Sequence, residues 1–340
     1  MRLRTGNRKL NMQRICTAVT LSLCKISVVI SIFLLPSIAP ARVEAAQAAI
    51  IVDAKTGVVL EKFQSEKKRQ IGSLTKIATA MVVLDWAAKQ GGDLNQVAVV
   101  PPIPSSELAV NGVDFQPGDS VTLRDLLYAA LVQSDNVAAY TLANHVGHAL
   151  MERIPVSTGS PRGSAVDYFV LQMNALAQHL GMLRTRFLNP SGVDAKEKPF
   201  STASDVARLT RYAMNNAGFR FYVSQKEREI EFGRGPARMR YLLRNTNEVL
   251  GRDEIDGVKT GRTERAGDCL VLSAARPSEV VQQGTTTLIT PRRLIVVLLA
   301  SPDRFGEGEA LLARGWALYD RWAEAGRPID PKQILGGSSE

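Results

Sequence analysis

Apolar residues recur along this 340-residue chain with two spacings, one typical of helices and one typical of strands. Where they return every three or four residues, the pattern predicts amphipathic helices. These helices are expected over residues 75–88, 122–133, 137–150, 166–180, 202–215 and 309–323. Short apolar runs near both ends of the chain predict strands instead. The expected strands cover 49–53, 58–62, 257–260, 269–275 and 294–300.

Polar residues at the ends of these runs set several boundaries. Thr122 with Asp125 fits a capping box, in which side chains satisfy the free N–H groups at a helix start. Gly181 suits the C-cap of the helix that precedes it. Residues 156–164 and 276–291 are rich in polar residues and turn formers, so we expect a surface loop in the first range and a hairpin loop in the second.

Strand-like runs at both ends of the chain, with helical runs between them, predict an α+β fold. The arrangement expected is one antiparallel sheet, made from both chain ends and flanked by helices, with a mainly helical insert. The charged stretch between 216 and 256 is expected to be irregular. No internal repeat or low-complexity domain interrupts this organisation.

Residues 1–48 predict an export signal, because a basic start is followed by an apolar run from 26 to 39 and then by small residues. The basic residues are Arg2, Arg4, Arg8, Lys9 and Arg14. Cleavage fits after either Ala45 or Ala48. An uncleaved membrane anchor is the alternative, although the apolar run is short for a bilayer span. The rest of the chain is expected to form one domain, 49–325, and a short C-terminal tail, 326–340.

The expected signal also changes the meaning of the charge and of the cysteines. The formal net charge is +9, and removing the net +6 of residues 1–48 leaves +3. The excess of basic residues therefore reflects targeting and does not predict nucleic-acid binding. Cys16 and Cys24 lie in the signal, so only Cys269 remains and no internal disulfide can form. Because Cys269 lies in an apolar run, we expect it in the core.

Three short motifs carry candidate chemistry: Ser73-Leu74-Thr75-Lys76, Ser134-Asp135-Asn136 and Lys259-Thr260-Gly261. On a helix Ser73 and Lys76 share a face, so the amine can reach the hydroxyl. A serine attacks only if a base takes its proton, and a lysine is such a base only where burial or a nearby cation lowers its pKa. Lys259 is the natural second cation. Ser73 in the first helical turn also places free N–H groups beside a reacting carbonyl.

Together, in this order, the motifs are typical of penicillin-binding proteins and class A β-lactamases. The chain resembles the D-alanyl-D-alanine carboxypeptidase family of low-molecular-mass penicillin-binding proteins, over residues 49–323. Supporting stretches include Ile71-Gly72 before Ser73, Asn189-Pro190-Ser191-Gly192 and Asp256-Gly257-Val258 before Lys259. The resemblance implies a β-lactamase/transpeptidase-like fold and a penicillin-binding D,D-peptidase domain in the bacterial periplasm or cell-wall space, with neither cofactor nor metal.

The same resemblance implies an acyl-transfer mechanism. Ser73 attacks the carbonyl between the two terminal D-alanines of a peptidoglycan stem peptide and forms an acyl-enzyme, with Lys76 as its base. Ser134 relays a proton towards the leaving amine. The oxyanion is held by the backbone N–H groups of Ser73 and Arg262. β-Lactam antibiotics are expected to acylate the same serine.

Substrate binding is likewise implied for the remaining motif residues. Asn136 hydrogen-bonds the substrate backbone, while Lys259 and Thr260, followed by Gly261, favour its terminal carboxylate. Arg304 resembles a family arginine that meets this carboxylate, although the loop before it differs in length. The apolar stripe of the last helix is expected to pack on the sheet, so that no C-terminal membrane anchor is evident.

Several other functions compete with a D,D-carboxypeptidase. A one-domain form also resembles D,D-endopeptidases, which cut peptidoglycan cross-links, and the stretch 244–247 faintly echoes that branch. A class A-like β-lactamase needs a glutamate-held water, and no convincing glutamate lies between Ser134 and Lys259, so penicillins are expected to leave slowly. A non-catalytic peptidoglycan-binding protein is disfavoured by the intact motifs.

A Ser-His-Asp hydrolase or a metal site is also disfavoured. The histidines are His145, His148 and His179, and all three lie inside helical patterns. His145 and His148 have the spacing of a metal pair, but no third ligand is evident.

Overall fold

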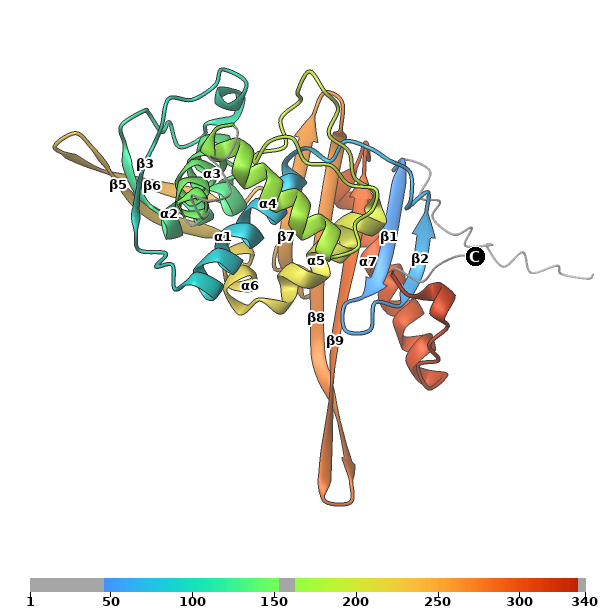
Figure 1. Cartoon of the computed structure of the whole chain (residues 1–340). Helices are drawn as coiled ribbons and strands as arrows, with labels where there is room; N and C mark the ends of the chain where they lie inside the picture. Colours follow the sequence, from blue (N-terminus) through green and yellow to red (C-terminus); the bar gives the residue numbers. More distant parts are fainter. Residues whose placement is uncertain (1–45, 153–162, 336–340) are drawn as a thin grey trace, which may run out of the picture. The chain divides into compact units, whose positions relative to one another are not determined.

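The computed structural model describes residues 46–152 and 163–335. Most of the expected signal, all but the last two residues of the loop expected at 156–164, and the last five residues of the tail lie outside the described residues. The main sheet has five antiparallel strands in the order β2-β1-β9-β8-β7 (Figure 1). The strands are β1 (Ala48–Asp53), β2 (Val59–Phe63), β7 (Ile255–Thr263), β8 (Gly267–Gln283) and β9 (Thr286–Leu299). Pairing of Ala48 with Leu299 and of Asp53 with Leu294 joins the two ends of the chain. The predicted α+β fold, with a sheet from both ends, is confirmed.

The central strands are continuous apolar runs because both faces of the sheet are covered. Along β1, Ile50 and Val52 belong to the core beneath the helical layer, whereas Ile51 belongs to a second core on the opposite face. Helix α7 (Arg304–Glu324) packs on that second face. Successive side chains of a strand point to opposite faces, so a strand between two layers has to be apolar at every position.

Most predicted helices are confirmed, with small changes at their ends. The helices are α1 (Lys76–Gln90), α2 (Leu123–Tyr128), α3 (Asn136–Met151), α4 (Ala165–His179), α5 (Ala203–Asn215) and α6 (Ala217–Val223). Thr122 caps α2 by accepting from the N–H of Asp125. Gly181 follows α4 with φ +69°, the left-handed conformation expected of a C-cap glycine. Helix α7 begins earlier than predicted, because Asp303 caps it by accepting from the N–H of Gly306.

A second sheet lies outside the prediction. Its four strands have the order β3-β4-β5-β6 and comprise β3 (Val97–Val99), β4 (Ser120–Thr122), β5 (Glu227–Arg234) and β6 (Ala237–Arg244). The prediction that 216–256 is irregular is therefore wrong. The charges of this stretch pair across the hairpin, as between Glu231 and Arg240 at 2.8 Å, so a strand rich in charge is stable at the surface.

The prediction of a loop over 276–291 is also wrong. Strands β8 and β9 continue through this range and pair as far as Gln283 and Thr286, forming a two-stranded arm that extends beyond the sheet (Figure 1). The arm is rich in β-branched residues such as Val280 and Ile289, which favour strands even though both are exposed here. Without a buried face, the arm lacks the alternation by which a strand is recognised in a sequence.

The apolar stripe of α7 packs on the sheet, as predicted. Leu311, Leu312, Trp316 and Tyr319 are buried in the second core. Gly315 allows this close packing, since a Cβ atom there would lie 2.9 Å from Ile51. Among the helices of the described part of the chain, none is both long and apolar enough to cross a bilayer.

Candidate active site

Ser73 lies in a short 3₁₀ turn, η1 (Gly72–Thr75), and not in the first turn of α1 as predicted. Helix α1 begins at Lys76. In a 3₁₀ turn residues i and i+3 eclipse each other, so the turn still brings the two side chains together. The amine of Lys76 lies 2.9 Å from the hydroxyl oxygen of Ser73.

Two glycines allow η1 to lie against β7. A Cβ atom on Gly72 would come within 3.1 Å of the backbone nitrogen of Arg262, and one on Gly261 would come within 2.6 Å of the carbonyl oxygen of Ile71. Gly72 also has a φ of +53°, which side chains rarely adopt. The nucleophile turn therefore touches the backbone of the Lys259-Thr260-Gly261 strand directly.

Three oxygens surround the amine of Lys76, which is fully buried. Its Nζ lies 2.9 Å from Ser73 Oγ, 2.6 Å from Asn136 Oδ1 and 2.9 Å from the carbonyl oxygen of Ser191. Burial lowers the pKa of Lys76 to about 8, against the opposing charges of Glu107 and Asp135. The neutral amine, which can take a proton from Ser73, is thus within reach near neutral pH.

Lys259 is also buried, and its Nζ donates to the carbonyl oxygen of Thr260 at 3.1 Å. Burial, and then the charges of Lys76 and Arg304, lower the pKa of Lys259 well below its ordinary value. Burial is the largest cause of the lowered pKa of Lys76, so burial supplies the effect for which the sequence offered either burial or a nearby cation. The charge of Lys76 in turn helps to lower the pKa of Lys259.

Ser134 follows a π-helical turn, η3 (Ala129–Gln133), and adopts the left-handed conformation with φ +66°. Such a conformation costs a non-glycine residue free energy and is held here by the elements on both sides. Asp135 immediately begins α3 by accepting from the N–H of Ala138 at 2.9 Å. This tight change of direction leaves the Ser134 side chain 8% exposed at the site.

Asn136 has an unused donor. Its side-chain oxygen accepts from Lys76, whereas its buried side-chain nitrogen has no hydrogen-bond partner among the described residues. A buried amide group is normally paired, so this nitrogen is available to the carbonyl oxygen of a ligand.

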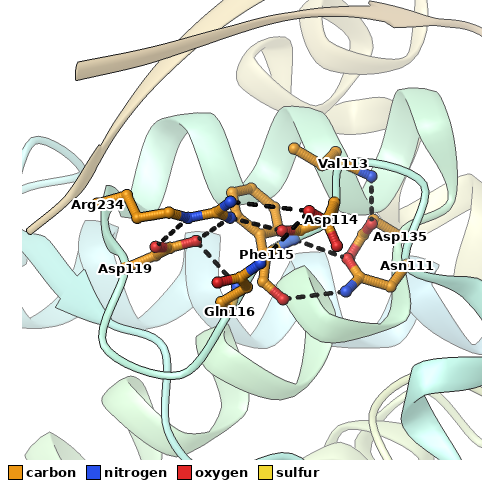
Figure 2. A network of polar contacts seen from close by, with 8 residues as sticks. All are labelled: Asn111, Val113, Asp114, Phe115, Gln116, Asp119, Asp135 and Arg234. Carbon is orange, nitrogen blue, oxygen red and sulfur yellow. Dashed lines mark hydrogen bonds and ion pairs between the residues drawn. The ribbon is translucent and has the colours of Figure 1, made fainter. Parts of the chain in front are cut away.

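Asp135 fixes the loop that precedes α2 as well as α3. Figure 2 shows its carboxylate accepting from the N–H of Val113 at 3.2 Å, in a network that continues across the loop. Asn111 bonds the backbone of Phe115 through both its side-chain atoms at 3.0 Å. Arg234 of β5 then holds Asp119 through two hydrogen bonds of 2.9 and 2.8 Å. The loop is thereby tied to the Ser134-Asp135-Asn136 turn at one end and to the second sheet at the other.

Thr246 joins the helical turn that precedes Ser134 to the strand that contains Thr260. Its N–H donates to the carbonyl oxygen of Val132 at 3.1 Å, and its hydroxyl lies 2.6 Å from that of Thr260. No role for Thr246 is evident from the sequence beyond the echo in 244–247. A threonine in a charged stretch has no local signature that would mark such a bridge.

Of the two candidate arginines, Arg262 belongs to β7, whereas Arg304 is the first residue of α7 and contacts β7. Arg304 donates to the carbonyl oxygen of Gly261 and to the carboxylate of Asp268, each at 3.3 Å. The Arg262 side chain is 78% exposed, so its expected role falls to its backbone N–H. The structure thus joins Ser73, Lys76 and Asn136 through hydrogen bonds and places Arg304 and the nucleophile turn against β7. Ser134 lies two residues before Asn136, and no hydrogen bond of its side chain is found among the described residues.

The other candidate groups lie apart from this chemistry. His145 lies 3.3 Å from the side-chain oxygen of Gln96, and no cluster of three metal-ligating side chains is present in residues 46–152 and 163–335. Cys269 is fully buried, and burial raises the pKa of its thiol to about 11, as expected of a core cysteine.

Known proteins resemble this chain closely. A family model described as D-alanyl-D-alanine carboxypeptidase matches residues 37–283. The chain is 32% identical to the D-alanyl-D-alanine carboxypeptidase DacC of Escherichia coli (strain K12), over 84% of this chain and 64% of that protein. It is 31% identical to a D-alanyl-D-alanine endopeptidase of Pseudomonas aeruginosa, over 80% of this chain and 77% of that one. The chain therefore spans less than two thirds of the first relative.

The fold has a solved counterpart. The crystal structure of the Streptomyces K15 DD-transpeptidase aligns with a TM-score of 0.67 at 28% identity, covering 80% of this chain and 97% of that chain. This likeness gives the protein a β-lactamase-like fold, as the sequence predicted.

Proposed function

Because the chain belongs to the D-alanyl-D-alanine carboxypeptidase family, we propose that it is a serine-type D,D-carboxypeptidase that removes the terminal D-alanine from peptidoglycan stem pentapeptides. One observation carries the proposal: a buried amine with a pKa of about 8 lies 2.9 Å from the hydroxyl of Ser73. A lysine of this kind can act as a base, and a serine beside it can act as a nucleophile.

In the proposed reaction Lys76 takes the proton of Ser73 while Ser73 Oγ bonds to the carbonyl carbon. The backbone N–H groups of Ser73 and Arg262 stabilise the oxyanion, an arrangement supported by the contact of η1 with β7. The C–N bond then breaks, and the proton that Lys76 took from Ser73 passes through the hydroxyl of Ser134 to the leaving amine. Water releases the shortened peptide from Ser73 in the second half of the reaction.

The substrate carboxylate would supply a negative charge beside Lys259. The charges of Lys76 and Arg304 help to lower the pKa of Lys259. A terminal carboxylate beside Lys259 and Thr260 would raise that pKa again and so favour the charged lysine. The site therefore favours peptides that end in a free carboxylate.

The peptide backbone can bind along β7. This strand is at the edge of the five-stranded sheet, so its outer row of backbone groups does not pair with another strand of that sheet. An extended peptide can add to such an edge. The free side-chain nitrogen of Asn136 would then be the donor to a peptide carbonyl.

A D,D-endopeptidase is the second candidate, because one relative is named a D-alanyl-D-alanine endopeptidase and the chain covers 77% of it. Purified protein beginning at residue 46 should shorten pentapeptide stems of isolated peptidoglycan to tetrapeptides, leaving cross-links intact, as read by mass spectrometry. Ser73→Ala should abolish the change. Conversion of cross-linked dimers to monomers would favour the endopeptidase, and no product from the unaltered protein would contradict both functions.

We also propose that the export signal is cleaved after Ala45. Cleavage after Ala48 would remove Gln47, whose N–H donates to the carbonyl oxygen of Leu299 at 3.0 Å, and Ala46, which is buried in the second core. N-terminal sequencing of the exported protein should therefore begin at Ala46. A start at Ala49 would show that Ala46, Gln47 and the first residue of β1 are dispensable to the sheet.

A further inference from the structure

A groove rich in positive charge lies beside the nucleophile turn. Its volume is about 600 Å³. Four of the residues that line it are basic and none is acidic; the lining residues are Lys68, Arg69, Gln70, Lys198, Pro199, Phe200 and Arg265. Because Arg69 lies three residues before the start of η1, the groove adjoins the turn that carries Ser73.

Three segments that are far apart in the sequence form this groove, and hydrogen bonds join them. The N–H of Arg69 donates to the carbonyl oxygen of Ser201 at 2.8 Å, and the N–H of Ser201 donates back to the carbonyl oxygen of Arg69 at 2.8 Å. The guanidinium of Arg265 donates to the carbonyl oxygen of Ala195 at 2.9 Å. These bonds fix the segments around 69, 200 and 265 against one another, so the groove belongs to the folded framework.

Nearby acidic side chains leave most of this positive charge unbalanced. Glu197 pairs with Arg186 at 2.9 Å. Asp194 accepts from the hydroxyl of Thr263 at 2.9 Å and from the backbone N–H of Arg265 at 3.3 Å. Within residues 46–152 and 163–335, no ion pair joins any of the four basic side chains to a carboxylate. A hollow lined by charges of one sign attracts ligands of the opposite sign.

Two of the basic side chains lie deep enough to strengthen this attraction. The amine of Lys68 lies 4.3 Å from the centre of the Phe200 ring, a contact that leaves its N–H donors free for an anion. Arg69 is half-buried, and its Nε atom is buried without a hydrogen-bond partner among the described residues. No acceptor therefore offsets this part of the guanidinium charge.

The direction of the substrate along β7 puts the groove on its acyl side. In the proposed reaction the terminal carboxylate lies beside Lys259 and the reacting carbonyl lies beside the N–H of Arg262, so the rest of the peptide continues towards the C-terminal end of β7. Arg265 follows directly after that end. The leaving D-alanine has a single carboxylate, already placed beside Lys259. Any other carboxylate of the substrate therefore belongs to the part that remains on Ser73.

We propose that this groove is a second anion subsite, which binds a carboxylate of the peptidoglycan stem on the acyl side of the scissile bond. The exposed side chains of Lys198 and Arg265 contact the carboxylate, and the half-buried Arg69 adds its charge from below. The subsite thereby selects stems with free internal carboxylates over stems in which these groups are amidated. The inference rests on the proposed function.

The test measures D-alanine release from two synthetic stem pentapeptides that both end in D-alanyl-D-alanine. The internal carboxylates are free in one peptide and amidated in the other. Two partly exposed charge pairs are together worth about a tenfold preference. The wild type should favour the free-carboxylate peptide by that factor in kcat/KM, through a lower KM at an unchanged kcat. High salt should reduce the preference, because it screens exposed charges.

The double variant Lys198→Gln, Arg265→Gln should lose this preference. Its kcat/KM for the free-carboxylate peptide should fall about tenfold, and its kcat/KM for the amidated peptide should stay unchanged. The matched control is Lys89→Gln with Arg321→Gln, which removes one lysine and one arginine from exposed positions on the last turns of α1 and α7. The control should keep the wild-type preference.

Two further measurements separate binding in the groove from damage to the active site. Benzylpenicillin has a single carboxylate, so it should acylate Ser73 at the same rate in the wild type and in both double variants. Arg265→Gln also removes the hydrogen bond to Ala195, so the single change Lys198→Glu provides a variant that keeps this bond. Lys198→Glu should likewise lower kcat/KM for the free-carboxylate peptide alone.

Equal kcat/KM of the wild type for both peptides would overturn the inference and leave the proposed function intact. An equal loss on both peptides in Lys198→Glu, with normal acylation by benzylpenicillin, would overturn it as well. A wild-type protein that releases D-alanine from neither peptide and does not react with benzylpenicillin would overturn the proposed function itself.

Discussion

Replacing Lys76 with methionine should slow the acylation of Ser73 by penicillin about 10²–10⁴-fold, the usual contribution of a general base. Methionine has an apolar side chain of similar length and can occupy the buried position of Lys76. It has no amine to accept the proton of Ser73, whose hydroxyl oxygen lies 2.9 Å from the Lys76 amine in the wild type. The rate should be measured as the appearance of labelled protein under single-turnover conditions. Wild-type penicillin labelling should also rise with pH through about 8, where Lys76 loses its proton.

The matched control is Lys89→Met, on the last turn of the same helix. It removes the same charge from an exposed position and should leave the acylation rate unchanged. Lys76→Met also leaves Asn136 Oδ1 and the Ser191 carbonyl oxygen without their donor, at a cost of about 1–3 kcal/mol for each acceptor that stays buried and unpaired. A melting curve separates this loss of stability from the loss of the base. Near-wild-type acylation in a folded variant would rule out Lys76 as the base.

Replacing Asp135 with alanine should lower the free energy of unfolding by about 2–4 kcal/mol. The change removes the N-cap of α3, where Asp135 accepts from Ala138, and leaves the N–H of Val113 buried without its acceptor. Urea unfolding monitored by circular dichroism measures the difference.

Asp135→Asn separates the two contributions. An asparagine has one acceptor oxygen, so it can keep the cap on Ala138 while turning its amide nitrogen towards the N–H of Val113. We expect this variant to lose about half of the stability lost by Asp135→Ala. Equal stability of Asp135→Ala and the wild type would show that neither hydrogen bond contributes to the fold.

The sequence was sufficient to predict that Ser73 and Lys76 lie together, because their motif is local. Ser73 and Lys76 are three residues apart, and any tight helical turn brings two such side chains together. The strands at both ends of the chain were also evident, because a strand covered on both faces is apolar at every position. The second sheet and the β8–β9 arm were missed, since their exposed strands carry charged or β-branched residues without a buried alternation.

Glu107 shows how little a local sequence says about burial. It lies in an ordinary Ser-Ser-Glu-Leu stretch, which predicts an exposed residue. In the structure it is only 3% exposed, because the turn η2 (Glu107–Val110) packs against α3.

The sequence by itself determined which residues we propose for the acyl-transfer chemistry, because their spacing is a property of neighbouring turns. Only the tertiary structure decided the pKa values of the two lysines, because burial lowers both of them. Lys76 meets the carbonyl oxygen of Ser191, 115 residues away, and it is burial among such distant partners that lowers its pKa to about 8. Desolvation depends on every element packed around a group, and no local pattern of residues contains that information.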